Sequence, residues 1–162
     1  MSPQDLIIPV GAAIVSFAVA AGFAAWVSKQ KPGTQRMLDI SNAVRVGAMA
    51  FLRREFKIVI PVAIGLAVLI GAAIGFSNGI AFAVGAGLSA LAGLISLKIT
   101  VKAAVRAANA SGQGLGHTFA LAFRGGATVG LAVPAMALLA ITLLYFVFPD
   151  PITIAGVGIG AS

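Results

Sequence analysis

The sequence contains no cysteine, one histidine and only four acidic residues among its 162 positions. The lack of cysteine excludes disulfides, thiol nucleophiles and thiolate metal sites. The few His, Asp and Glu residues leave little material for metal coordination or acid-base catalysis. We therefore predict no catalytic, substrate-binding or metal site formed by this chain alone.

Charge is also scarce, whereas apolar residues dominate. Hydrophobic residues make up 60% of the chain and charged residues 9%, and the mean hydropathy is +1.07. This composition is too apolar for a solvated surface and indicates an integral membrane protein whose partner is the lipid bilayer. The net charge of +7 does not indicate nucleic-acid binding. The basic residues lie between apolar runs and have no aromatic side chains interleaved for base stacking.

Four apolar runs are long enough to cross a bilayer, which predicts an all-α fold, a polytopic transmembrane helix bundle. The expected full spans are residues 6–27, 58–76, 80–97 and 119–148. Residues 152–162 are expected to start a fifth helix that is too short to cross, so we expect a truncated sequence from a longer protein. All 162 residues are expected to form a single membrane domain.

The segments between the spans contain helix and turn signals. Residues 34–57 are predicted to form an amphipathic helix that continues into the second span, because apolar residues recur there at helical spacing. Residues 77–79, Ser-Asn-Gly, predict a turn before the third span. The glycine-rich residues 112–116 are expected to end one helix and start the next, and His117 beside them is expected to be solvated rather than a metal ligand.

The distribution of basic residues predicts the orientation. All eleven Lys and Arg residues lie in the first and third connections or in the helix ends beside them. Because cytoplasmic loops carry an excess of Lys and Arg, these basic connections are expected in the cytoplasm and the N-terminus outside.

Small residues at four-residue spacing predict faces where helix backbones approach closely. The third span has the longest series and the strongest case, whereas chance occurrence is a fair alternative for the pairs elsewhere. The residues are Gly71 with Gly75; Gly85, Ser89 and Gly93; Gly126 with Gly130; and Gly156 with Gly160.

Four charged residues are candidate structural charges: Glu55, Arg124, Arg106 and Arg54. Glu55 falls on an apolar stripe, and the residues three and four positions away cannot pair with it, so its partner must come from another segment. We predict Arg124 or the stripe of Lys98, Lys102 and Arg106 as that partner. Hydration at the membrane interface and a role in an ion path are alternatives for Glu55, and snorkelling to the interface is an alternative for Arg124.

Four short strings resemble elements of one known family, the membrane-integral pyrophosphatases, and they occur in the same order. The longest, at residues 47–57, reads Gly-Ala-Met-Ala-Phe-Leu-Arg-Arg-Glu-Phe-Lys and is similar to an element near the start of these proton- or sodium-pumping enzymes. The others are residues 104–107, 122–127 and 156–162. Phe56, Ala104, Val157 and Ile159 depart from the residues usual at those positions of the family.

The resemblance implies an N-terminal fragment of a pump, most simply a proton pump, driven by hydrolysis of inorganic pyrophosphate. It implies a homodimer with about sixteen helices per subunit, a cytoplasmic magnesium-pyrophosphate site and, we expect, a prokaryotic plasma membrane. The magnesium ligands and catalytic residues of the family lie on later segments, so none is carried over to this chain. The remaining helices of the pump would be its partners, and the chain alone is expected to be inactive.

Two other functions are compatible with the residues. One is a self-standing membrane scaffold or assembly protein without catalysis. The other is a channel or carrier, which would require polar residues lining the bundle, whereas these spans offer only scattered Ser and Thr.

Overall fold

The computed structural model describes residues 3–148 and 150–161. Ser162, the last residue of the predicted fifth helix, and Pro149, which follows the predicted fourth span, lie outside the described residues. The helices are α1 (Pro3–Lys29), α2 (Gln35–Ala73), α3 (Phe76–Ala110), α4 (Leu115–Val147) and α5 (Pro151–Ala161), with a short 3₁₀ turn at Ser111–Gln113. The prediction of an all-α bundle is confirmed. Four helices, α1 to α4, are long and apolar enough to cross a membrane.

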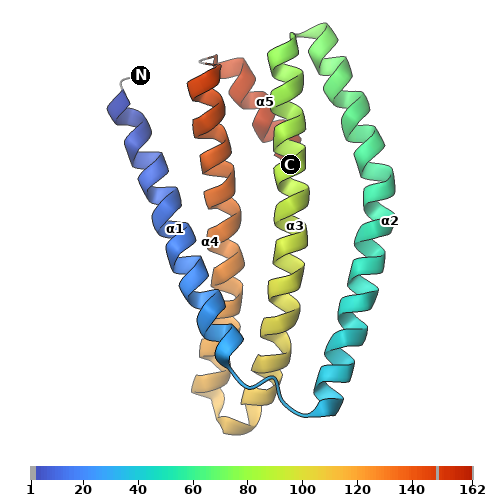
Figure 1. Cartoon of the computed structure of the whole chain (residues 1–162), viewed down its shortest axis with the longest axis vertical. Helices are drawn as coiled ribbons and strands as arrows, with labels where there is room; N and C mark the ends of the chain where they lie inside the picture. The colour runs from blue at the N-terminus through green and yellow to red at the C-terminus, as the bar shows by residue number, and fades with distance from the viewer. Residues whose placement is uncertain (1–2, 149, 162) are drawn as a thin grey trace.

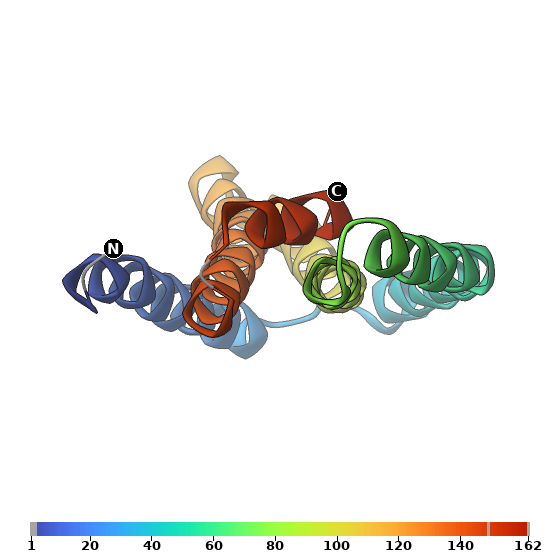
Figure 2. The same ribbon diagram turned by 90° about the horizontal axis from the view of Figure 1, so that it is seen from above.

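The four long helices lie roughly antiparallel in the spatial order α1, α4, α3, α2, and α5 lies against α3 (Figure 1). Seen from above, the bundle is an elongated layer with α1 and α2 at opposite edges (Figure 2). The α1–α2 and α3–α4 connections share one end, which we call the basic end. The start of α1, the α2–α3 turn and the start of α5 share the other, which we call the far end.

Helix α2 begins where the sequence pattern predicts. Thr34 is its N-cap, and the Thr34 hydroxyl accepts a hydrogen bond from the backbone N–H of Met37 at 3.4 Å. The helix then runs without a break through the predicted amphipathic segment and past Pro61 into the apolar residues. None of its residues is buried, so most of its apolar surface is exposed on this chain and suited to contact lipid or other helices.

The turn between α2 and α3 differs from the prediction. Ser77, Asn78 and Gly79 lie within the first turns of α3, and the chain reverses at Ile74 and Gly75 instead. Gly75 has a φ of 148°, which side chains disfavour, and its carbonyl accepts the backbone N–H groups of Asn78 and Gly79. Glycine therefore permits the reversal, and the helix starts directly after it.

Glycines bring three helices into backbone contact at the far end. A Cβ at Gly79 would lie 2.6 Å from the Ala67 carbonyl oxygen of α2. One at Gly85 would overlap the Val157 carbonyl of α5, and one at Gly160 would overlap the Phe82 carbonyl of α3. The small-residue faces predicted at Gly85 and at Gly156 with Gly160 are thus real contacts, whereas Gly93, Gly126 and Gly130 have open space around them.

Two small hydrophobic clusters complete the packing. The cluster at the basic end joins α1, α3 and α4 through Val27, Ala103, Ala110 and Leu121. The cluster at the far end joins α3, α4 and α5 through Ala81, Ala140 and Val157. These buried residues are mostly alanines, so close helix spacing rather than a bulky core determines the arrangement.

Adding a single methyl group tests the α2–α3 contact. We expect Gly79→Ala to lower the thermal midpoint of the purified chain in detergent, because the new methyl group meets the α2 backbone; overpacking of this kind costs about 1–3 kcal/mol. Gly87→Ala is the matched control on the same helix, since a Cβ there meets nothing within 4 Å. The thermal midpoints are measured by circular dichroism. Equal midpoints for the two variants would contradict the close approach of α2 and α3.

Candidate functional site at the basic end

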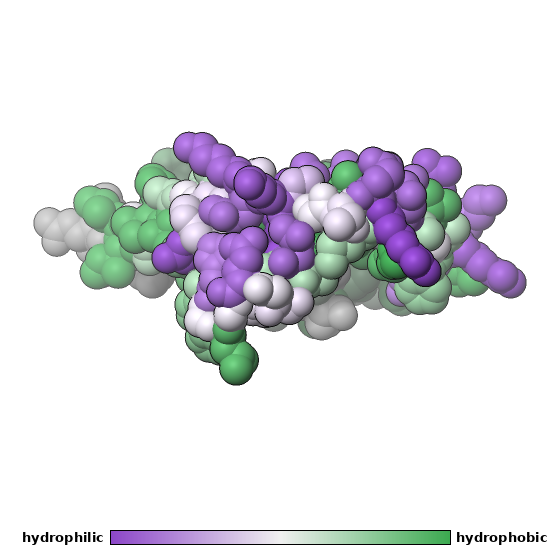
Figure 3. All heavy atoms as spheres, turned by 90° about the horizontal axis from the view of Figure 1, so that it is seen from below, coloured by the Kyte–Doolittle hydropathy of each residue, from purple (hydrophilic) through white to green (hydrophobic). Residues whose placement is uncertain are grey.

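Polar and charged side chains gather at the basic end. The molecule seen from below shows hydrophilic residues covering the ends of the helices and of their connections (Figure 3). Two pockets lie here: a polar one of about 250 Å³ between the α1–α2 connection, α3 and the start of α4, and one of about 620 Å³ between α2 and α3 that has both apolar and charged walls. The contacts of these side chains indicate what the region does.

Arg106 of α3 holds the end of α1. Its guanidinium donates hydrogen bonds to the backbone carbonyls of Gln30 at 3.1 Å and Ser28 at 3.3 Å, and to Lys102 of its own helix at 2.9 Å. The last carbonyls of a helix have no partner within the helix, and a cation is favourable there because of the helix dipole. Arg106 therefore caps the end of α1 from a neighbouring helix.

Asn109, one turn further along α3, holds the next part of the connection. Its side-chain amide donates to the Lys31 carbonyl at 3.2 Å. Gly33 follows with a φ of 100°, and a Cβ there would lie 3.1 Å from the Asn109 Cβ. Arg106 and Asn109, which we call the loop clamp, thus hold the chain between α1 and α2 against the end of α3.

Trp26 of α1 contacts two side chains of α4. The Arg124 guanidinium lies 3.9 Å from the centroid of the Trp26 ring, a cation–π contact. The His117 ring meets Trp26 edge-on, with the ring centroids 6.3 Å apart. His117 is half-buried in this contact, so the expectation that it is solvated is only partly right. The sequence offered no signal for this cluster, because α1 and α4 are distant in the chain.

Glu55 and Arg54 lie exposed near the middle of α2. Among the described residues Glu55 forms no ion pair, so the pairing predicted with Arg124 or with the stripe on α3 is not made within them. Helices α2 and α3 run antiparallel, and Gly71 of α2 faces Gly79 of α3. Counting the same number of residues along each helix from this contact toward the basic end places Glu55 near the level of Ile95, about one turn from Lys98. Between its ends α2 bows away from α3 (Figure 1).

The described residues do not fit a magnesium site. No three His, Cys, Asp or Glu side chains come together among them. Asp39 accepts a hydrogen bond from Gln35 and Asp150 bonds the start of α5, so two of the acids have local roles. We derive no magnesium-dependent step from residues of this chain.

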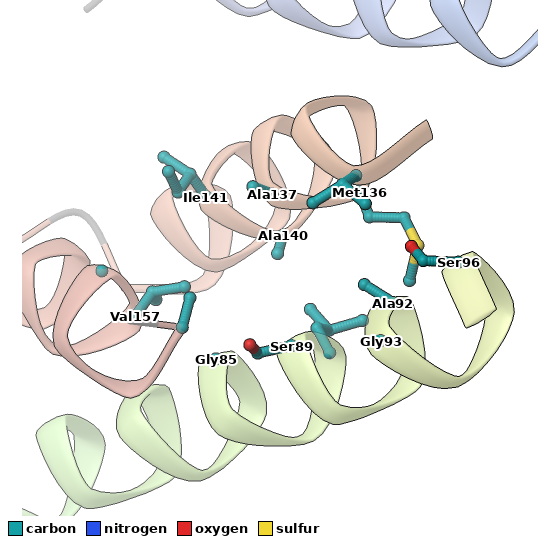
Figure 4. A pocket seen from close by; sticks show the side chains of 14 residues that line it. Gly85, Ser89, Ala92, Gly93, Ser96, Met136, Ala137, Ala140, Ile141 and Val157 are labelled. Carbon is teal, nitrogen blue, oxygen red and sulfur yellow. The ribbon is translucent and has the colours of Figure 1, made fainter. Parts of the chain in front are cut away.

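An apolar groove of about 430 Å³ lies between α3 and α4, below the end of α5. Figure 4 shows Met136 of α4 pointing toward Ser96 of α3, and Ser89 facing the same space. Among the described residues that line the groove, these two serines are the only ones with polar side chains, and the others are small or aliphatic. The groove therefore provides no continuous polar path of the kind that a channel requires.

The fold and the basic end together define a polytopic membrane protein of packed helices with one cationic face. Comparison with known proteins makes this more specific, since the sequence model of the family described as "Inorganic H+ pyrophosphatase" matches residues 14–162. The chain belongs to this family of membrane pyrophosphatases.

Curated relatives agree with this assignment. A K⁺-insensitive pyrophosphate-energized proton pump of Methanosarcina mazei is 39% identical over 153 residues, which cover 93% of this chain and 23% of the relative. A second pump of that description from Moorella thermoacetica is 38% identical over 164 residues, covering 96% and 24%. A K⁺-stimulated pyrophosphate-energized sodium pump of Thermotoga maritima is 40% identical over 131 residues, covering 80% and 18%. The chain thus spans about a quarter or less of the length of these relatives.

Removal of the Arg106 guanidinium tests the loop clamp. We expect Arg106→Gln to destabilise the chain by about 1.5–3 kcal/mol, the usual range for hydrogen bonds to a charged group, and to speed amide hydrogen exchange in residues 28–34. Lys102→Gln is the matched control. It also removes one positive charge, one turn away on α3, but the Lys102 ammonium group has no bonded partner among the described residues. Equal exchange in the two variants would show that Arg106 does not hold the connection.

A double-mutant cycle tests the contact between Trp26 and Arg124. Trp26→Leu and Arg124→Gln should show a coupling free energy of about 0.5–2 kcal/mol in unfolding measurements, as expected for a partly desolvated cation–π pair. The control cycle combines Trp26→Leu with Arg36→Gln, since Arg36 is exposed and has no contact with the ring. A coupling no larger than that of the control would contradict the pairing.

Proposed function

We propose that this chain is the N-terminal portion of a pyrophosphate-energized ion pump, in which hydrolysis of inorganic pyrophosphate drives ion transport across the membrane. The observation that carries the proposal is the family match over residues 14–162, supported by named pumps at 38–40% identity. The pump's substrate is pyrophosphate, and its remaining helices cover much of the exposed apolar surface of α2.

The transported ion is the proton. The Methanosarcina and Moorella relatives match more than nine-tenths of this chain and are named proton pumps, whereas the named sodium pump of Thermotoga matches 80%. The family resemblance supports a homodimer and a magnesium-dependent reaction. Because the described acids do not gather into a metal site, the magnesium ligands are assigned to parts of the pump outside this chain.

The helices of this chain support the pump rather than catalyse. The basic end faces the cytoplasm of a prokaryotic cell, as the positive-inside rule favours, and the N-terminus lies outside. Its unpaired cations give that face a field that attracts the anionic substrate. The loop clamp and the Trp26 cluster keep α1, α3 and α4 in register on this side.

A chimera tests the proposal. Residues of this chain replace the matching segment of the Methanosarcina pump, and inverted vesicles are assayed for magnesium-dependent pyrophosphate hydrolysis and pyrophosphate-driven acidification. We expect the chimera to keep both activities and the 162-residue chain alone to have neither.

Two controls make the result decisive. A chimera with Arg106→Gln should assemble less well, whereas Arg36→Gln, at an exposed position without a bonded partner among the described residues, should not change assembly. This comparison ties activity to the contacts described above. Hydrolysis by the chain alone would overturn the supporting role. A well-assembled chimera without hydrolysis would instead favour the alternative of a self-standing scaffold.

A further inference from the structure

A pocket of about 620 Å³ separates α2 from α3 next to the basic end, and it combines two kinds of wall. Leu97, Val101 and Met49 supply apolar surface, while Arg45, Lys98 and Lys102 supply positive charge. No acidic side chain of the described residues lines it. A site with this composition matches a ligand that is anionic at one end and apolar along its length.

The positive charges are available to such a ligand. Lys98 and Lys102 are exposed, and neither ammonium group bonds another described residue. Arg45 donates only to the neutral Asn42 side-chain amide, at 2.9 Å. Arg106, at the rim, is occupied by the carbonyls of α1, so it contributes its charge but not free donors. Three cations without an opposite charge in one pocket repel each other until an anion binds.

The apolar part continues through the gap between the two helices. A second pocket of about 570 Å³ opens on the other side of α2 and α3, and its lining shares Leu97, Val101 and Val105 with the first. Met37, Ile40 and Val44 extend its apolar wall on α2. The bowing of α2 away from α3 leaves this gap open (Figure 1). An acyl chain can lie in it beside a headgroup at the cations.

The level of the pocket suits a phospholipid. Lys98 follows directly after the apolar residues of α3, and counting from the Gly71–Gly79 contact places Met49 level with Val101 and Arg45 level with Val105. On α3 the lysines therefore stand where the apolar run ends. Basic pockets between transmembrane helices at this depth bind the headgroups of anionic lipids.

We propose that the α2–α3 gap is a binding site for one anionic phospholipid, whose phosphate is held by Lys98, Lys102 and Arg45 and whose acyl chain lies against Leu97 and Val101. The lipid replaces the close helix contact that glycine provides at the far end, and so fixes the distance between α2 and α3 at the basic end. The proposal does not depend on pyrophosphate chemistry.

Native mass spectrometry of the purified chain, titrated in detergent with phosphatidylglycerol or phosphatidylcholine, tests the site. We expect one phosphatidylglycerol to bind in preference to phosphatidylcholine. Lys98→Gln with Lys102→Gln should weaken phosphatidylglycerol binding roughly tenfold or more, from about 1 kcal/mol per basic residue, and leave phosphatidylcholine unchanged. The control, Arg53→Gln with Lys57→Gln, removes the same charge from exposed positions of α2 outside the pocket and should change binding less than about twofold.

A third variant separates shape from charge. Val101→Phe keeps every cation but narrows both pockets, so it should weaken phosphatidylglycerol and phosphatidylcholine alike. It also keeps the test informative if the double lysine variant fails to fold, as judged by circular dichroism. If the lysine double variant and the control double variant lost phosphatidylglycerol affinity equally, the proposal would be overturned, because the lipid would then be attracted by the overall positive charge and not by this pocket. Displacement of the lipid by millimolar inorganic phosphate or pyrophosphate would overturn it in favour of a free-anion site.

Discussion

Close approach of backbones at glycine is the constraint on which this structure depends. Helices in a bilayer gain nothing from burying apolar side chains, which lipid solvates equally well, so they associate through packing and polar contacts. In this chain α3 touches α2 at Gly79 and α5 at Gly85, and α5 in turn meets α3 at Gly160. These contacts make α3 the central helix, and the positions of α2 and α5 follow from it.

The other end of the bundle is held by different chemistry. Gly125 of α4 closes on Ala103 of α3, and Gly33 of the α1–α2 connection lies against the Asn109 side chain, whereas Gly47 of α2 has no such contact. Arg106 and Asn109 instead bond the backbone carbonyls of the connection. This difference follows from the surroundings, because carbonyls at the end of α1 need hydrogen-bond donors, whereas carbonyls inside a helix do not. Between these two anchored regions α2 is free to bow outward.

The sequence predicted the long helices better than the turn before α3 and the contacts between helices. Hydropathy placed the long helices, since each has a run of apolar residues that only a bilayer explains. The turn before α3 was misplaced because Ser77-Asn78-Gly79 is a strong turn signal, yet the decisive residue was Gly75, which alone adopts a positive φ there. The Trp26 cluster and the loop clamp could not be predicted, because both join segments far apart in sequence. Glu55 was assigned a partner from helix order alone, and the bowing of α2 is not readable from the residues.

At the basic end, arginine and lysine side chains differ in whether they contact other residues. Each described cation with a bonded or stacked partner is an arginine: Arg106 on carbonyls, Arg124 on Trp26 and Arg45 on Asn42. Arginine's planar group bonds several acceptors at once and stacks on rings, whereas the lysine ammonium is a compact and strongly hydrated charge. The lysines of α3 have no bonded partner among the described residues and remain available to anions outside the bundle. Replacing these lysines therefore changes the field of this face while leaving the contacts that hold the helices together, whereas replacing Arg106 or Arg124 removes such contacts as well as a charge.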